Sequence, residues 1–234
     1  MIKNTVLLLF VLLGGIGFQA CQNTQAGSPK APEVDKSQPK VANQKKDDDG
    51  ITRIGIGDEM PMGDVKMKDV SGKMISLNDA MGENGLIVNF SCNTCPFVVA
   101  WEDRYPMIEK MAAENKMGVI LLNSNERKRL ENDMADSFDA MVKHAKETGY
   151  NSYYTVDKNH QIADAMGAFT TPHIFVFDKD KKLAYKGAID DNYKDAAGVE
   201  ANYLKDAVSA IVKGEKANPA ETKGNGCSIK RLKS

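Results

Sequence analysis

The sequence has no surplus of basic residues, because 31 lysines and arginines stand against 32 aspartates and glutamates in 234 residues. A nucleic-acid-binding surface must neutralise phosphates with positive charge, so we expect no nucleic-acid partner. Cysteine and histidine are also scarce, with four and three copies, and the only CxxC pair has no second CxxC or close histidine pair beside it. A structural zinc site would normally need one of these. The length suits one domain with appendages.

The apolar run near the N-terminus is too short to span a bilayer. Val6–Phe18 has thirteen uncharged residues, whereas a transmembrane helix needs roughly 20. With Lys3 before it, the run fits a secretory signal peptide. It ends at Phe18-Gln19-Ala20-Cys21, which resembles the lipobox of bacterial lipoproteins, although Phe18 replaces the usual leucine. The resemblance implies lipidation of Cys21 after removal of residues 1–20. The alternatives are an ordinary signal peptide or a buried segment with a chance cysteine.

Residues 21–50 carry prolines and polar side chains with almost no large apolar residue. Such a segment cannot bury enough surface to offset its conformational entropy, so we expect a disordered tether. Its reach would be on the order of 30 Å. The protein is therefore expected in the bacterial cell envelope, lipid-anchored to a membrane on the extracytoplasmic (periplasmic) side.

Residues 51–214 predict an α/β domain, followed by a mobile, Gly/Asn-rich tail at 215–234. The run 86–90 is typical of a strand covered on both faces. Pro106 should kink the helix in which it lies. Predicted strands cover 65–69, 74–77, 86–90, 119–123, 153–157, 174–177 and 183–187, and predicted helices cover 97–114, 136–146, 161–166 and 200–212. This order implies a mixed central sheet with helices on both faces.

Cys92-Asn93-Thr94-Cys95 lies between the buried strand and the first long helix. A CxxC pair in this context is typical of a redox site. If Cys92 begins the helix, unpaired N–H groups and the helix dipole favour its thiolate, which is the species that attacks disulfides. Pro96 suits the first helical turn because its missing N–H has no helical partner there. A structural disulfide or half of a zinc site are the alternatives.

Several motifs together resemble one family. They are Gly57-Asp58-Glu59-Met60-Pro61, the strand 86–90, Cys92 and Cys95, Thr170-Thr171-Pro172, the hairpin at 174–187 and the tail Gly226-Cys227-Ser228-Ile229-Lys230. Residues 57–212 thereby resemble the thioredoxin-like redoxins, and most closely an AhpC/TSA-type, peroxiredoxin-like subgroup. The resemblance implies a thioredoxin-like fold and a cis peptide before Pro172. It also implies that Thr171 and Pro172 face the cysteines and bind substrate.

Two rival functions follow from the same residues. Peroxiredoxins carry Pro and Thr seven and three residues before the reactive cysteine. Here those places hold Gly85 and Asn89 for Cys92, or Val88 and Cys92 for Cys95, which argues against a peroxidase. A copper-binding or delivery protein would use Cys92, Cys95 and His173, since this set suits copper(I).

The favoured function is a membrane-anchored thiol–disulfide oxidoreductase that needs neither cofactor nor metal. Cys92 is expected to attack a protein or small-thiol disulfide and Cys95 to resolve the product, while the redox partner stays unidentified. Cys227 is the auxiliary thiol left over, either a relay to the CxxC pair or a partner-binding cysteine. Trp101 is expected in the core, and the charged residues 102–104 on a solvated face.

Overall fold

The computed structural model describes residues 51, 53–131 and 134–232. The predicted signal peptide, the lipidation site Cys21 and the tether at 21–50 lie outside the described residues. Among the helices of the described part, none is long and apolar enough to cross a membrane.

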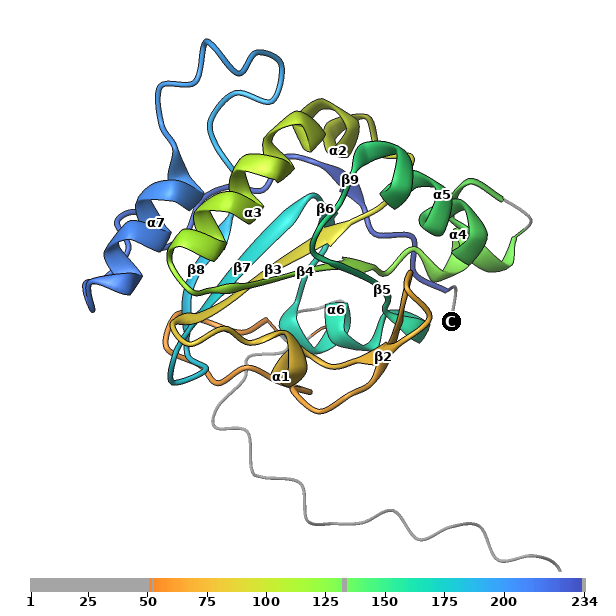
Figure 1. Cartoon of the computed structure of the whole chain (residues 1–234), viewed down its shortest axis with the longest axis horizontal. Coiled ribbons are helices and arrows are strands. Elements are labelled where there is room, and N and C mark those ends of the chain that lie inside the picture. Colours follow the sequence, from red (N-terminus) through yellow and green to blue (C-terminus); the bar gives the residue numbers. More distant parts are fainter. Residues whose placement is uncertain (1–50, 52, 132–133, 233–234) are drawn as a thin grey trace, which may run out of the picture. The chain divides into compact units, whose positions relative to one another are not determined.

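A seven-stranded sheet with the order β2-β1-β5-β4-β3-β7-β8 forms the centre (Figure 1). Its strands are β1 Met67–Asp69, β2 Met74–Ile75, β3 Gly85–Ser91, β4 Gly118–Asn123, β5 Tyr153–Val156, β7 His173–Asp178 and β8 Leu183–Gly187. β3, β4 and β5 are parallel to one another. The other neighbours pair antiparallel. The predicted mixed sheet is confirmed.

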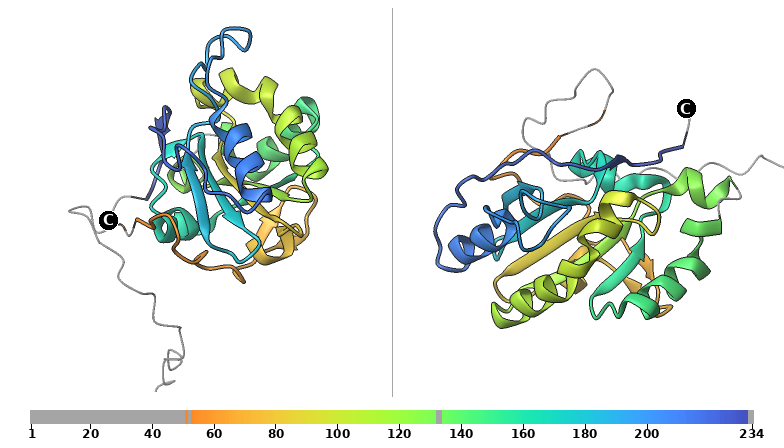
Figure 2. Two further views of the ribbon diagram at one scale, coloured as in Figure 1. Left: turned by 90° about the vertical axis from the view of Figure 1, so that its left-hand side faces the viewer. Right: turned by 90° about the horizontal axis from the view of Figure 1, so that it is seen from above.

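Helices cover both faces of the sheet, as the sequence predicts. α2, α3, α5 and α7 pack on one face, and α1 and α6 pack on the other (Figure 2). The helices are α1 Leu77–Ala80, α2 Pro96–Trp101, α3 Tyr105–Glu114, α4 Glu126–Leu130, α5 Phe138–Thr148, α6 Gln161–Met166 and α7 Tyr203–Val212, with 3₁₀ turns at Glu102–Arg104, Met134–Asp136 and Lys158–His160. The sequence missed α1 and α4, and the strand predicted at 74–77 ends at Ile75.

β3 shows how the two faces are built from one strand. Leu86, Val88 and Phe90 enter the core under α1 and α6, whereas Ile87 enters the core under α2 and α3. Successive side chains of a strand point to opposite faces. Because both faces are covered, every residue of β3 is buried, and the sequence shows a continuous apolar run here rather than an alternation.

The helix predicted at 97–114 is broken between α2 and α3. Pro106 lies in the first turn of α3, where it needs no hydrogen-bond acceptor. Trp101 is fully buried, as expected, and its indole N–H donates to Asp190 at 2.8 Å. The expectation of a solvated charged face is wrong for Arg104, because its side chain is buried against the same carboxylate at 3.0 Å.

The C-terminal segment is not the mobile tail that its composition suggests. A short strand, β9 Cys227–Ser228, pairs antiparallel with β6 Thr170–Thr171 (Figure 1). The next residue, Ile229, is buried in the core under α1 and α6. Sequence periodicity could not reveal this pairing, because the two strands have two residues each and lie far apart in the chain.

Candidate active site

Three thiols converge at one end of the sheet. Cys92 directly follows β3, Cys95 is the N-cap of α2, and Cys227 lies in β9. All three are free thiols. Cys92 and Cys95 are 1% and 3% exposed, whereas Cys227 is only half-buried. The sequence grouped the first two correctly, and the structure brings the third beside them.

Cys95, rather than Cys92, lies at the helix N-terminus. The residue before a proline is disfavoured in the α conformation, and Cys95 precedes Pro96 with an extended backbone at φ −73° and ψ 122°. The helix therefore begins at Pro96, which occupies the first turn as predicted, and the residues between the cysteines stay outside it. The expectation that Cys92 begins the helix is wrong.

The surroundings shift the pKa values of Cys92 and Cys95 in opposite directions. A hydrogen bond from the Cys92 thiol lowers the pKa of Cys95, and further hydrogen bonds from Cys227, the backbone N–H of Val98 and the hydroxyl of Thr171 support the same thiolate. The same contact with Cys95 raises the pKa of Cys92, and burial and the charge of Asp136 raise it further. Of the two thiols, Cys95 is therefore the one that loses its proton more easily.

Thr171 lies between the thiols. Its hydroxyl is 3.5 Å from the Cys92 sulfur, and its carbonyl, 3.0 Å from the Cys95 sulfur, accepts a hydrogen bond from Cys95 when that thiol is protonated. The Thr171–Pro172 peptide is cis, as the resemblance implies. However, the backbone edge of Thr171 is already paired with Cys227 of β9. The substrate-binding role of Thr171 and Pro172 therefore stays a prediction.

Asp136 holds the loop between the cysteines, a role that no sequence pattern indicated. Its buried carboxylate accepts from the Asn93 N–H at 2.9 Å and the Thr94 hydroxyl at 3.1 Å. The side-chain amides of Asn123 and Asn125 donate to it as well, at 3.1 and 3.2 Å. Four donors fix the carboxylate, so the loop geometry and the negative charge near Cys92 are both set by one residue distant in the chain.

His173 points to the other face of the sheet from the cysteines. It pairs in register with Phe90, so its side chain shares the face of α1 and α6, whereas the cysteines pack under α2. Its ring contacts Phe169 and Phe175, and its Nδ1 has no hydrogen-bond partner. Burial, with a smaller effect of the Lys186 charge, lowers the pKa of His173 to about 3.

The copper alternative therefore loses its ligand set. Within residues 51, 53–131 and 134–232, no group of three histidine, cysteine or acidic side chains lies close enough to hold a metal ion. The register of β7 is the reason, because it separates His173 from the cysteines by the thickness of the sheet.

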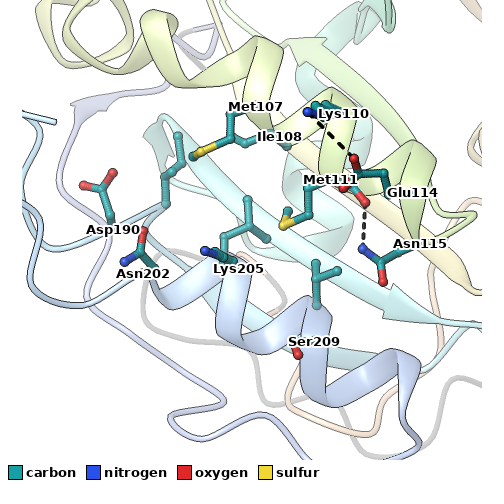
Figure 3. Close-up of a pocket in the computed structure, with 13 residues that line it drawn as sticks. Met107, Ile108, Lys110, Met111, Glu114, Asn115, Asp190, Asn202, Lys205 and Ser209 are labelled. Atoms are coloured by element: carbon teal, nitrogen blue, oxygen red, sulfur yellow. Dashed lines mark hydrogen bonds and ion pairs between the residues drawn. The ribbon is translucent and has the colours of Figure 1, made fainter. Parts of the chain in front are cut away.

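A cleft of about 380 Å³ lies between α3 and α7, away from the thiols. Figure 3 shows Met107 and Met111 on one wall and Lys205 and Ser209 on the other. None of its described lining residues is a cysteine or histidine. The cleft has no thiol for disulfide exchange among these residues, and the thiol cluster remains the candidate active site.

Comparison with known proteins identifies the family of the chain. Residues 56–186 match the AhpC/TSA family. The chain belongs to this family. The predicted redoxin membership is thereby confirmed, and the matched region contains Cys92, Cys95, Thr171 and Pro172 but ends before Cys227. No relative among curated protein sequences matches the chain.

Solved structures confirm the thioredoxin-like fold. An uncharacterised conserved protein from Geobacillus kaustophilus is 27% identical, with a TM-score of 0.68 over 77% of this chain and 94% of that one. A hypothetical protein from Sinorhizobium meliloti is 26% identical, with a TM-score of 0.70 over 77% and 97%. The peroxidoxin BcpB from Mycobacterium tuberculosis is 14% identical, with a TM-score of 0.52 over 69% and 98%, and it shares the fold.

Proposed function

We propose that this protein is a thiol–disulfide oxidoreductase whose reactive pair is Cys92 and Cys95. The observation that carries the proposal is the position of the pair, two free thiols after β3 and at the N-cap of α2 that both contact Thr171 before the cis Pro172. Their mutual contact favours the thiolate on Cys95, and a thiolate is the species that attacks disulfides.

In this mechanism Cys95 is the nucleophile. Its thiolate attacks one sulfur of a substrate disulfide, the Cys95–substrate bond forms, and the other substrate sulfur leaves as a thiolate that takes up a proton. Cys92 then loses its proton and attacks the Cys95 sulfur, which forms the Cys92–Cys95 disulfide and releases the second substrate thiol. These roles reverse the ones that the sequence favoured, because the helix begins at Pro96.

Peroxide reduction has less support from the site. With Cys95 as the nucleophile, the residues seven and three positions before it are Val88 and Cys92 rather than the Pro and Thr of peroxiredoxins. Val88 is fully buried in the opposite core, and a thiol, that of Cys92, stands where peroxiredoxins have the threonine hydroxyl. A peroxide turnover assay on the same protein provides the comparison with disulfide exchange.

The test separates the two sulfurs in chains that also carry Cys227→Ser, so that only the pair can react. After exposure to glutathione disulfide, Cys92→Ser should accumulate glutathione on Cys95, because the resolving thiol is gone. Cys95→Ser should accumulate none on Cys92. Iodoacetamide should alkylate Cys95 first, with a midpoint below the free-thiol value of about 8.5. If neither variant traps glutathione, the oxidoreductase proposal is wrong.

We also propose that lipidation of Cys21 anchors this activity outside the cytoplasmic membrane, where exported proteins and small thiols would be its substrates. The support is the Lys3 n-region, the run Val6–Phe18 and the Ala20-Cys21 junction. A lipid anchor of several acyl chains holds a protein stably. Cys21→Ala should therefore leave the membrane fraction. A variant that fractionates as the wild type does would refute the anchor without touching the exchange chemistry.

A further inference from the structure

The segment around Cys227 is fixed on both sides of the cysteine. Before Cys227, the chain pairs with β8. The backbone N–H of Lys186 donates to the Ala220 carbonyl at 3.0 Å, and the backbone N–H of Thr222 donates to the Lys186 carbonyl at 3.1 Å. The Thr222 hydroxyl also accepts from the Ala188 N–H at 2.9 Å. The approach to β9 is therefore set by the sheet edge.

After Cys227 the chain is held equally well. The Ile229 N–H donates to the Phe169 carbonyl at 2.9 Å, and the Lys230 N–H donates to the side chain of Asn125 at 2.8 Å. Arg231 forms an ion pair with Asp164 at 2.6 Å. These contacts fix the position of Cys227 along the strand.

The register of this strand places Cys227 against the reactive pair. Cys227 is the direct partner of Thr171, and the Thr171 carbonyl is 3.0 Å from the Cys95 sulfur. The Cys227 side chain packs against the core cluster that contains Cys92 and Cys95. Burial, together with the neighbouring Cys95, raises the pKa of Cys227 to about 11. Gly226 allows this approach, since a Cβ atom there would lie 2.4 Å from the Thr171 carbonyl oxygen.

Access distinguishes the three thiols. Cys92 and Cys95 are closed off at 1% and 3% exposure, and Cys227 is the thiol of the cluster that is partly open to solvent. While β9 is in place, an outside thiol can reach the sulfur of Cys227 more readily than either sulfur of the pair.

On this basis, and on the proposed function, we propose that Cys227 is the outer redox thiol of the site, through which Cys95 exchanges disulfides with outside thiols. In the oxidised protein, Cys227 loses its proton and attacks the Cys95 sulfur. The Cys95–Cys227 bond forms, the Cys92–Cys95 bond breaks, and Cys92 takes the electron pair and a proton. This internal exchange changes no oxidation state overall.

The disulfide is then passed from Cys95 and Cys227 to thiols outside the protein. An outside thiolate, from a protein or a small thiol, attacks the Cys227 sulfur, and Cys95 leaves as a thiolate. A second outside thiolate attacks the mixed disulfide, which releases Cys227 and leaves an outside disulfide in exchange for a reduced Cys92–Cys95 pair. The reverse sequence reduces an outside disulfide. Since the leaving group departs faster when its pKa is lower, Cys95 suits this step.

The first experiment looks for the Cys95–Cys227 bond in the full chain carrying Cys92→Ser. After brief oxidation with glutathione disulfide, mass mapping should find Cys95 joined to Cys227 within one molecule. The matched control moves the thiol by one residue in Cys92→Ser/Cys227→Ser/Ser228→Cys. Successive strand residues face opposite sides, so this variant should retain glutathione on Cys95. Glutathione retained on Cys95 beside a free Cys227, or a cross-link from position 228, would overturn the proposal.

The second experiment measures the rate at which glutathione disulfide oxidises the reduced Cys92–Cys95 pair, in a single turnover, in the otherwise wild-type chain. Cys227→Ser should lower the rate on the order of tenfold, because exchange must then wait for local opening of the tail. Unchanged protection of the Ile229 amide from hydrogen exchange would show that the tail still binds. A rate equal to or above that of the wild type would mean that β9 only blocks the site, and would overturn the relay. That outcome leaves the proposed function standing, whereas loss of glutathione trapping at Cys95 would end both.

Discussion

Replacement of Gly226 by alanine tests whether close contact of β9 with Thr171 controls the reactive pair. The added methyl group would lie 2.4 Å from the Thr171 carbonyl oxygen and 2.8 Å from its carbon, whereas ordinary contact begins near 3.4 Å. The tail must therefore retreat by about 1 Å. A hydrogen bond of 2.9 Å, such as that from Ile229 to Phe169, does not survive a stretch of this size.

The loss of one or two such hydrogen bonds costs roughly 1–3 kcal/mol. At 1.4 kcal/mol for each factor of ten, the detached tail becomes about 5 to 150 times more populated. Because the detached state exposes Cys95, its alkylation by iodoacetamide should accelerate by the same factor. In the Cys92→Ser background, formation of the Cys95–Cys227 bond should slow in parallel. Mass spectrometry of quenched time points measures both.

Gly224→Ala is the matched control on the same segment. Its added methyl group would meet the Thr170 hydroxyl at 3.1 Å and the His173 ring only at 3.7 Å or beyond. A side chain can yield by a few tenths of an ångström where a backbone carbonyl cannot, so alkylation of Cys95 should change little. Equal rates in the two alanine variants would refute the reasoning, because they would show that contact with Thr171 does not limit access.

Three further outcomes follow from the buried charges. Arg104→Ala should lower the free energy of unfolding in urea by about 3–5 kcal/mol, because Asp190 loses its buried ion pair; a loss below about 1 kcal/mol would contradict this. Asp136→Asn should lower the pKa of Cys92, since the charge of Asp136 helps to raise it; ultraviolet thiolate absorbance against pH measures the shift, and an unchanged midpoint would count against it. Burial lowers the folded pKa of His173 to about 3 from an unfolded value of 6.5, so the unfolded chain binds the extra proton between these values and stability falls with acidity. Between pH 7.5 and 4.5 the loss should be roughly 3 kcal/mol, and a His173→Phe chain with the same pH dependence would disprove the assignment.

The sequence predicted the elements whose signals are local. The hairpin strands and α6 were placed within one residue of their observed bounds, since alternation, turn residues and Gly167 mark them directly. The order of these elements along the chain was then enough to predict the mixed sheet. The same reasoning placed Cys92 and Cys95 between β3 and α2, because strand and helix patterns meet there.

The missed features depend on contacts between distant segments. The opposite orientation of His173 follows from its pairing with Phe90, and the anchoring role of Asp136 follows from hydrogen bonds across more than forty positions. The roles of Cys92 and Cys95 differ from these missed features, because a local rule could have predicted them. Pro96 disfavours a helical Cys95, so the helix start could have been placed at the proline, with Cys95 as its N-cap.

The pairing of β9 also bears on which substrates the site can take. A polypeptide that adds to the Thr171 edge must displace the tail, and it gains in return the same backbone hydrogen bonds that the tail gives up. The balance is therefore decided by side chains, chiefly Ile229, whose burial stabilises the closed state by roughly 1.5–3 kcal/mol, together with the ion pair of Arg231 with Asp164. A protein substrate that lacks an apolar residue two positions after its cysteine cannot replace Ile229 in the core. In the proposed relay, such a substrate would react at the sulfur of Cys227, as a small thiol would, and its backbone would not need to displace β9.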